Sequence, residues 1–488
     1  MVHKAFLAIA ALIVGLTAVM AVNTLLVAPR RLEAPPANEL QVDGDAAARR
    51  LADAVRFPTI SQDADGPEAS DAFRDLHRFL ARNFPKVHAT LERRTIGDYS
   101  LLFRWSGSDP SLEPVLLSAH MDVVPVEPGT EERWSHPPFS GALADDAIWG
   151  RGTLDDKVSV LGILEAAEFL LAQSFTPRRT IYFAFGHDEE VGGRAGAAGI
   201  AAHLAEQDVV LEFTLDEGSV IAHGLVPGVA KPVALIGVAE KGYVSVELTA
   251  TAEGGHSSVP PLSTAIGRLA RAVHRLETDP MPAKLTPPLS EMLDYLAPEM
   301  SLAQRVVLAN RWLFEPWLLS RFAQVPQTNA LIRTTTAPTL MTGGVAENVL
   351  PTEAKAVINF RLLPGDTIGS VMEQVHAIIA DPGISVRRIG DGGHAPSAVA
   401  NSRSSSFAAL YTTVRQVFPD VVVAPGLVIA GTDSIHYAQL AKDSYRFLPL
   451  RLASEDLERI HGTDERIMIE NYTEIIHFYI QLLLNVTP

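Results

Sequence analysis

Five short segments hold the residues of this chain best suited to chemistry. They are the acidic or histidine-bearing stretches HMD (120–122), LDDK (154–157), DEE (188–190), LDEG (215–218) and HGTDE (461–465). Carboxylates held close together repel one another unless a cation or a shared proton offsets the repulsion. The chain has no cysteine, so histidine, aspartate and glutamate would have to hold any zinc. This donor set predicts a site for two divalent ions, zinc first, with Co²⁺ or Mn²⁺ as alternatives.

Three of these segments come directly after apolar strands. The strands are expected in PVLLSAH (114–120), TIYFAFG (180–186) and VVLEFTLDEG (209–218), with helices at about 46–55 and 158–172 between or before them. Strands that alternate with helices indicate an α/β fold with a mostly parallel sheet covered on both faces. Ligands bind such sheets beyond the carboxyl ends of the strands. We therefore expect the acidic segments to meet at one edge of this sheet.

A second pattern begins at Gly242. It runs as a strand (242–254), a helix (262–276), two strands (331–340 and 353–362), a helix (368–379) and a strand (384–389). This order is that of a ferredoxin-like α+β unit. We expect a smaller domain at 241–392, inserted into a catalytic domain made of 46–240 and 393–488. A helical insertion at 279–327, which includes RWLFEPWLLSRFA with two tryptophans, is expected to pack in a core or interface rather than cap the substrate.

The N-terminal thirty residues differ from the rest of the chain. The stretch AFLAIAALIVGLTAVMAVNTLLVA (5–28) is long enough to cross a bilayer core of about 30 Å as a helix. A cleavable signal peptide has a shorter apolar core, so we favour an uncleaved signal anchor at 1–30, followed by a Pro-rich linker at 31–45. The rest of the protein is expected outside the cytoplasm, or secreted or periplasmic if the segment is cleaved. The net charge of −17 argues against a nucleic-acid partner.

The motifs HMDVVP, WGRGTLDDK, DEEVGG, GGHSS and NVLP, in this order, resemble a family of co-catalytic zinc hydrolases that includes aminoacylase and carboxypeptidase S. The resemblance runs from about Ala46 to the C-terminus and is greatest to the branch of carboxypeptidase S and the N-fatty-acyl-amino-acid hydrolases. It implies two Zn²⁺ per subunit and four ligands at known motif positions. His120 would bind one zinc, Asp155 would bridge both, and Glu190 and His461 would hold the second.

The last metal ligand implied by the resemblance falls in LDEG. Either Asp216 or Glu217 would supply it, since relatives use either. Adjacent residues of a strand point to opposite faces, so only one of the two is expected to reach the metal. Asp156 is expected to be a solvated or turn-capping neighbour of Asp155.

The resemblance also assigns three catalytic roles. Glu189 would be the general base, taking a proton from water and passing it to the leaving nitrogen. Asp122 would orient the His120 imidazole from behind. His256 would reach a neighbouring subunit's active site and polarise the scissile carbonyl, which implies a homodimer.

The substrate's carboxylate is the remaining feature that the resemblance addresses. Asn348 and Arg361 resemble positions that contact it, although an arginine at a strand end is as often part of a structural ion pair. Relatives commonly carry a basic residue where GTDSIHY (431–437) has Ile435. Either Arg361 and His436 suffice for the carboxylate, or the far end of the substrate is less anionic than usual.

These observations predict a dizinc metallohydrolase that releases a C-terminal amino acid from short peptides or N-acyl amino acids. One alternative is a non-catalytic peptide-binding module on the same fold, but such a module usually loses the base or a ligand and this chain keeps them all. Another is an aminopeptidase, which would need an acidic group to bind a free amine in place of an arginine.

Overall fold

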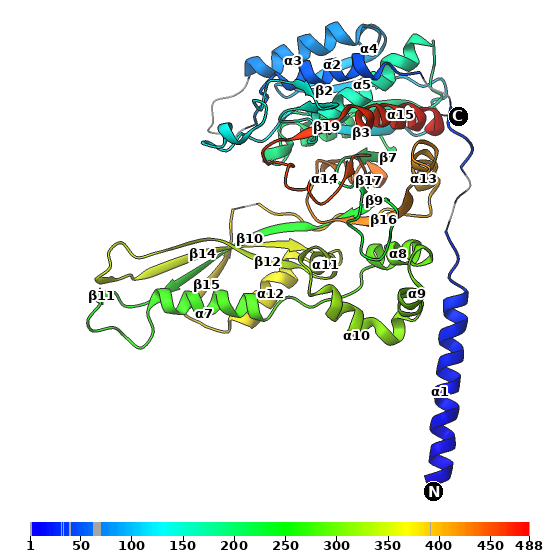
Figure 1. Cartoon of the computed structure of the whole chain (residues 1–488). Coiled ribbons are helices and arrows are strands. Elements are labelled where there is room, and N and C mark those ends of the chain that lie inside the picture. Colours follow the sequence, from blue (N-terminus) through cyan, green and yellow to red (C-terminus); the bar gives the residue numbers. More distant parts are fainter. Residues whose placement is uncertain are drawn as a thin grey trace.

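The structure is a computed structural model that describes residues 2–30, 32, 34–38, 41–61, 70–390 and 392–487. Within these residues a ten-stranded mixed sheet forms the centre of the larger part of the molecule (Figure 1). Its strands, in spatial order, are β1 (Glu92–Ile96), β2 (Ser100–Trp105), β6 (Ile181–Gly186), β3 (Val115–His120), β7 (Leu211–Asp216), β17 (Ala441–Arg446), β9 (Val233–Glu240), β8 (Ile221–Ala222) and β18 (Arg451–Leu452), with β16 (Val422–Val428) beside β9.

The middle of this sheet is parallel, as the sequence predicts. β6, β3, β7 and β17 pair in parallel, and antiparallel pairs lie toward both edges. Strands β16 and β17 come from beyond residue 393, so the chain does return to the first sheet after the second pattern.

Helices cover both faces of the large sheet. In β3, Val115 and Leu117 pack into one apolar cluster and Leu116 into another, because side chains alternate across a strand. The helices of the first cluster are α2 (Gly44–Val55), α3 (Ser70–Asn83), α4 (Pro85–Thr90), α5 (Lys157–Ala172), α13 (Ser405–Val417) and α15 (Ile469–Val486). The second cluster lies under α6 (Ala197–Ala205) and α14 (Ser434–Tyr437). This double cover explains why β3 is buried along its whole length.

A second, four-stranded antiparallel sheet has its own apolar core. Its order is β12 (Thr335–Gly343), β14 (Glu353–Leu362), β10 (Gly242–Thr251) and β15 (Ile384–Arg388). Helices α7 (Ala265–Thr278) and α12 (Ile368–Ile379) pack on one face, so buried and partly exposed residues alternate along β10 and β14. α7 begins three residues later than expected, because the Thr264 side chain accepts a hydrogen bond from the Gly267 N–H and caps the helix there.

Two of the chain segments that connect the two sheets lie side by side. The first crossing leads from β9 through Lys241 into β10, and the second returns near His394. Tyr243 and His394 exchange both backbone hydrogen bonds, at 3.0 and 2.9 Å, and the Ser397 N–H donates to the Glu240 carbonyl. The Lys241 ammonium is buried at this junction, where it donates to the carbonyls of Ala330 and Arg333.

The helical insertion forms a small cluster on the β9–β16 side of the large sheet. Its elements are α8 (Pro287–Leu296), a 3₁₀ turn (Ala297–Glu299), α9 (Leu302–Ala309), α10 (Arg311–Phe322) and α11 (Pro326–Ile332). Trp312 and Trp317, expected in a core or interface, are 59% and 54% exposed in this chain. The expectation of core packing is wrong for these two side chains, because α10 buries the opposite side, at Leu318.

The N-terminal helix α1 (Val2–Leu25) projects away from both sheets (Figure 1). It is long and apolar enough to cross a membrane, and none of its most apolar stretch is buried. The expected linker has no regular structure at residues 32, 34–38 and 41–43, and α2 begins at Gly44; Arg31, Glu33, Glu39 and Leu40 lie outside the described residues.

Candidate active site

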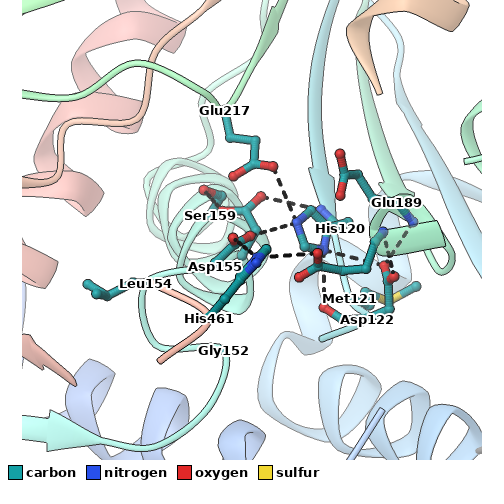
Figure 2. Close-up of polar contacts among 12 residues, drawn as sticks. His120, Met121, Asp122, Gly152, Leu154, Asp155, Ser159, Glu189, Glu217 and His461 are labelled. Carbon is teal, nitrogen blue, oxygen red and sulfur yellow. Dashed lines mark hydrogen bonds and ion pairs between the residues drawn. The ribbon is translucent and has the colours of Figure 1, made fainter. Parts of the chain in front are cut away.

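Histidine and acidic side chains meet at the carboxyl edge of the three central parallel strands (Figure 2). His120 is the last residue of β3 and pairs in register with Gly186, the last residue of β6. Glu189 and Glu190 lie in the turn after β6, and Glu217 directly follows β7. The parallel register brings these strand ends together, as the sequence predicts.

Two loops from elsewhere in the sequence complete this cluster. A three-stranded sheet of β4 (Ala142–Ala144), β5 (Ala147–Trp149) and β19 (Arg466–Met468) joins the loop that carries Asp155 to the loop that carries His461. Buried Glu465 accepts hydrogen bonds from the N–H groups of Gly152 and Leu154. Sequence reasoning grouped Glu465 with the chemical residues, whereas here it fixes the loop before Asp155.

Arg151 is a site residue that the sequence reasoning missed. Its guanidinium is buried, pairs with Glu465 and donates to the carbonyls of His461 and Gly462 at 3.0 and 3.1 Å. His461 has φ of 59°, in the left-handed region that a side chain rarely adopts. Arg151 therefore holds the His461 backbone in a conformation that presents its ring to the cluster.

Asp155 lies between the two histidines. Its Oδ1 is 2.9 Å from His120 Nε2, and its Oδ2 is 3.0 Å from His461 Nε2. Glu217 Oε1 lies 3.3 Å from His120 Nε2, and Glu190 Oε2 lies 3.3 Å from His461 Nε2. The cluster therefore has two halves, each with one imidazole and one glutamate, that share a single aspartate.

The structure separates the two acidic residues of LDEG. Glu217 turns toward His120 and belongs to a group of possible metal-ligating atoms within 4.8 Å of one another. Asp216, at the end of β7, is buried behind it and accepts a hydrogen bond from the Glu217 N–H. Adjacent strand residues do face opposite ways here.

Asp122 connects the two strand ends. One carboxylate oxygen lies 3.3 Å from His120 Nδ1, and the two oxygens accept the backbone N–H groups of Glu189 and Glu190. His120 Nδ1 also lies 3.0 Å from the Asp122 backbone carbonyl, so Asp122 orients the imidazole with its carbonyl and carboxylate and fixes the turn that carries both glutamates. Asp156 is at the N-cap position of α5, but it is fully buried and not solvated. Its carboxylate accepts hydrogen bonds from the Ser159 hydroxyl and the His120 N–H, which replace the lost water.

The cluster holds several buried carboxylates whose negative charges an added cation would stabilise. Burial, reinforced by Asp155, raises the pKa of Glu217 to about 7. Hydrogen bonds to Asp155 and Glu190 raise the pKa of His461 to about 10. Glu190 Oε1 is buried with no hydrogen-bond partner within the described part of the chain. Nitrogen and carboxylate donors with an unpartnered buried oxygen fit divalent zinc, as do the two halves that share Asp155.

A cleft of about 1010 Å³ opens onto the cluster from between the two sheets. Glu189, Arg361 and Ile435 all line it, and the Arg361 guanidinium lies over the Tyr243 ring at 4.9 Å. His436 also lines the cleft and contacts the Gly192 carbonyl at 3.1 Å. Arg194 is a further cation in the lining, and sequence reasoning missed it. Its position four residues after Glu190 could have marked it as a residue near the site.

Two residues assigned from the resemblance do not line this cleft. His256 ends the short strand β11 (Gly255–His256), and Asn348 directly precedes the strand paired with it, β13 (Val349–Leu350); both residues are exposed. β11 lies at the far end of the second sheet (Figure 1). The Ser257 N–H donates to the Asn348 carbonyl, so the two segments are held together.

Comparison with known proteins addresses the family. Residues 116–485 match Peptidase family M20/M25/M40. The chain is 44% identical over 442 residues to a probable carboxypeptidase S-like protein of Dictyostelium discoideum, covering 90% of this chain and 84% of that protein. It is 42% identical over 439 residues to an N-fatty-acyl-amino acid synthase/hydrolase of Xenopus tropicalis, covering 89% and 85%.

The chain belongs to the M20/M25/M40 peptidase family. The resemblance, the fold class and the assignment as a metallohydrolase are thereby confirmed. The crystal structure of an M20 family metallo-carboxypeptidase from Sulfolobus solfataricus has the same fold, with a TM-score of 0.65, 17% identity, and coverage of 91% of this chain and 99% of that one. The reading as a non-catalytic binding module is not favoured.

Proposed function

We propose that this chain is a dizinc amide hydrolase that releases the C-terminal amino acid of N-acyl amino acids or short peptides. The observation that carries the proposal is the position of Asp155 between His120 and His461. The cleft beside them is lined by Glu189, Arg194 and Arg361. His120, Asp155 and Glu217 would hold one zinc ion, and His461, Asp155 and Glu190 the other. Asp216 is left out of the ligand set.

When bound, zinc would polarise the scissile carbonyl and stabilise the negative charge that develops on it. The chain's own residues then handle the proton and the orientation of the substrate. Glu189 takes a proton from water in the cleft and delivers it to the leaving nitrogen. Asp122 fixes the backbone from which Glu189 projects, and so fixes the position of the base.

The cleft lining supports an N-acyl amino acid as the substrate. Arg361 and Arg194 provide cations for a carboxylate. The lining also includes apolar side chains, among them Val191, Ile389 and Ile435. An apolar Ile435, in place of the basic residue of relatives, suits an acyl chain better than a second charged group, and N-acyl amino acid hydrolysis is the activity named for one set of relatives. An aminopeptidase would need an acidic group for the free amine. The glutamates and the shared aspartate of this cleft are assigned to the metals and the base, which leaves the buried Asp433 as the acidic candidate in the lining.

A homodimer would bring His256 to the cleft of a partner subunit. β12 is an edge strand of the second sheet with a long exposed stretch, including Leu340 and Met341 at 65% and 54% exposure. Unpaired, apolar edge strands are surfaces for pairing with another chain.

We further propose that α1 anchors the enzyme in a membrane with both sheets outside the cytoplasm.

Side-by-side hydrolysis tests this proposal. N-acyl amino acids, Gly-X dipeptides and amino-acid amides are offered to the zinc-loaded enzyme, with and without a chelator. We expect release of the amino acid from N-acyl amino acids, and loss of activity with the chelator that zinc restores. Cleavage of amino-acid amides alone would overturn the proposal in favour of an aminopeptidase.

A further inference from the structure

α10 presents an uncharged apolar face to solvent. Trp312, Leu313 and Trp317 are 59%, 40% and 54% exposed, and Pro316 is exposed between them. At 100° per residue these four positions and Ser320 cover one continuous side of the helix. Leu318, on the other side, is buried in the cluster of the helical insertion. Large exposed apolar patches of this kind usually mark a binding surface.

This face begins where α1 touches the rest of the protein. Asn23 Nδ2 donates to Asn310 Oδ1 at 3.0 Å, and Asn310 Nδ2 reaches the Met20 carbonyl at 3.3 Å. Asn310 is fully buried under this contact and stands two residues before Trp312. In Figure 1, α9 and α10 lie beside the end of α1 that is nearer the sheets. The attachment of α1 therefore fixes the level of α10 relative to any membrane that α1 crosses.

The length of α1 puts that level at the membrane interface. Twenty-four helical residues span about 36 Å at 1.5 Å per residue, whereas the hydrocarbon core is about 30 Å thick. With the apolar residues after Lys4 in the core, Asn23 and Thr24 fall at the headgroup level. Tryptophan is enriched at this level, because its ring is apolar and its N–H is polar.

We infer that the face of α10 made by Trp312, Leu313, Pro316 and Trp317 docks into the interfacial layer of the phospholipid bilayer that α1 crosses. This inference rests on the proposed membrane anchor. It adds a second, peripheral contact that holds the protein in one orientation on the membrane. The net charge of −17 and the uncharged face indicate that the contact is apolar, so it does not require anionic lipid.

Tryptophan quenching by the bilayer tests this contact. Trp105, Trp134 and Trp149 are at most 7% exposed, so a quencher in the lipid reaches Trp312 and Trp317 selectively. The full chain is reconstituted in phosphatidylcholine vesicles with or without brominated acyl chains. We expect brominated lipid to lower the emission, and the double variant Trp312→Gln/Trp317→Gln to lose that decrease. The matched control Trp105→Phe removes one buried tryptophan and should keep the lipid-dependent decrease.

Flotation of the vesicles after alkaline carbonate treatment separates the two proposals. Protein that floats without quenching by brominated lipid overturns the docking of α10 and leaves the anchor standing. Protein that does not float overturns the anchor, and the docking with it. If Trp312 and Trp317 are shielded from both brominated lipid and soluble acrylamide, a protein surface covers them, which also overturns the docking.

Discussion

Replacement of Glu189 by glutamine separates catalysis from metal binding at this site. The Glu189 backbone N–H is held by Asp122 at 3.3 Å, and glutamine keeps that contact and the side-chain volume. Within the described part of the chain, no hydrogen bond reaches the Glu189 carboxylate, so the substitution breaks none there. We therefore expect the Glu189→Gln variant to fold and to bind both zinc ions.

The expected loss of turnover follows from the surroundings of Glu189. In the metal-free protein, burial and the nearby carboxylates of Glu217 and Asp433 raise the pKa of Glu189 well above its usual range. Of the neighbouring carboxylates, Glu190 and Glu217 are assigned to the metals, and Asp433 is buried with 4% of its surface exposed. We expect a decrease in kcat of about 10³ to 10⁴-fold, the upper half of the range for general bases, or about 4 to 5.5 kcal/mol of barrier.

The assay measures kcat on an N-acyl amino acid together with zinc content by elemental analysis. Glu190→Gln is the matched control, since it alters the adjacent residue in the same turn and should lower zinc occupancy instead. A Glu189→Gln variant with turnover near that of the parent enzyme would refute the role of the base. A variant that is inactive because it has lost zinc would show that Glu189 is a ligand.

Three other measurements test the surroundings of the site. Arg151→Gln leaves the buried Glu465 carboxylate without its cationic partner, so we expect the free energy of unfolding, measured by denaturant titration, to fall by about 3 to 5 kcal/mol. Zinc affinity, measured by competition with a chelator, should fall as well, and an unchanged affinity would contradict the positioning of His461 by Arg151. At pH 7 the metal-free protein should release at least about one proton on zinc uptake, because the pKa of His461 is about 10 and that of Glu217 about 7, and calorimetry in buffers of different ionisation enthalpy counts it. Burial lowers the pKa of Lys241 to about 7, so between pH 7 and 10 the Lys241 amine is protonated in the unfolded chain and neutral in the folded one. The free energy of unfolding should therefore rise with pH in that window, by up to about 1.4 kcal/mol per pH unit more than in the Lys241→Met variant, and equal pH slopes for the two proteins would rule this out.

The strands that position the site could be predicted from the sequence, because their apolar residues stand out from the polar residues that follow them. The strands that end at His120 and Gly186 are mostly apolar and fully buried, whereas the strand that ends at Asp216 has Glu212 and Thr214 between its apolar residues. The choice between Asp216 and Glu217 depends on which face of the strand end turns toward β3, and that requires the register of the sheet. Arg151 was missed because its role is a contact with a segment 310 residues away.

The exposure of α10 was beyond sequence patterns for a different reason. A helix with Trp312, Leu313, Leu318 and Phe322 is apolar on several sides, so periodicity does not tell which side is buried. The position of His256 was likewise open, because the strand that carries it, β11, pairs with β13 from more than 90 residues further along the chain. Both features concern surfaces for which we propose partners outside the chain.

The paired crossings between the sheets also bear on how the protein folds. The large sheet needs β16 and β17, which are synthesised only after the second sheet, so the loop from β9 to β16 spans roughly 180 residues. Because Tyr243 and His394 are hydrogen-bonded to each other, a second sheet that forms first brings these two ends together. The remaining loop between β9 and β16 is then about 30 residues instead of about 180, which lowers the entropic cost of closing the large sheet by about 1.5 kcal/mol. Early formation of the smaller core would thus speed assembly of the catalytic one.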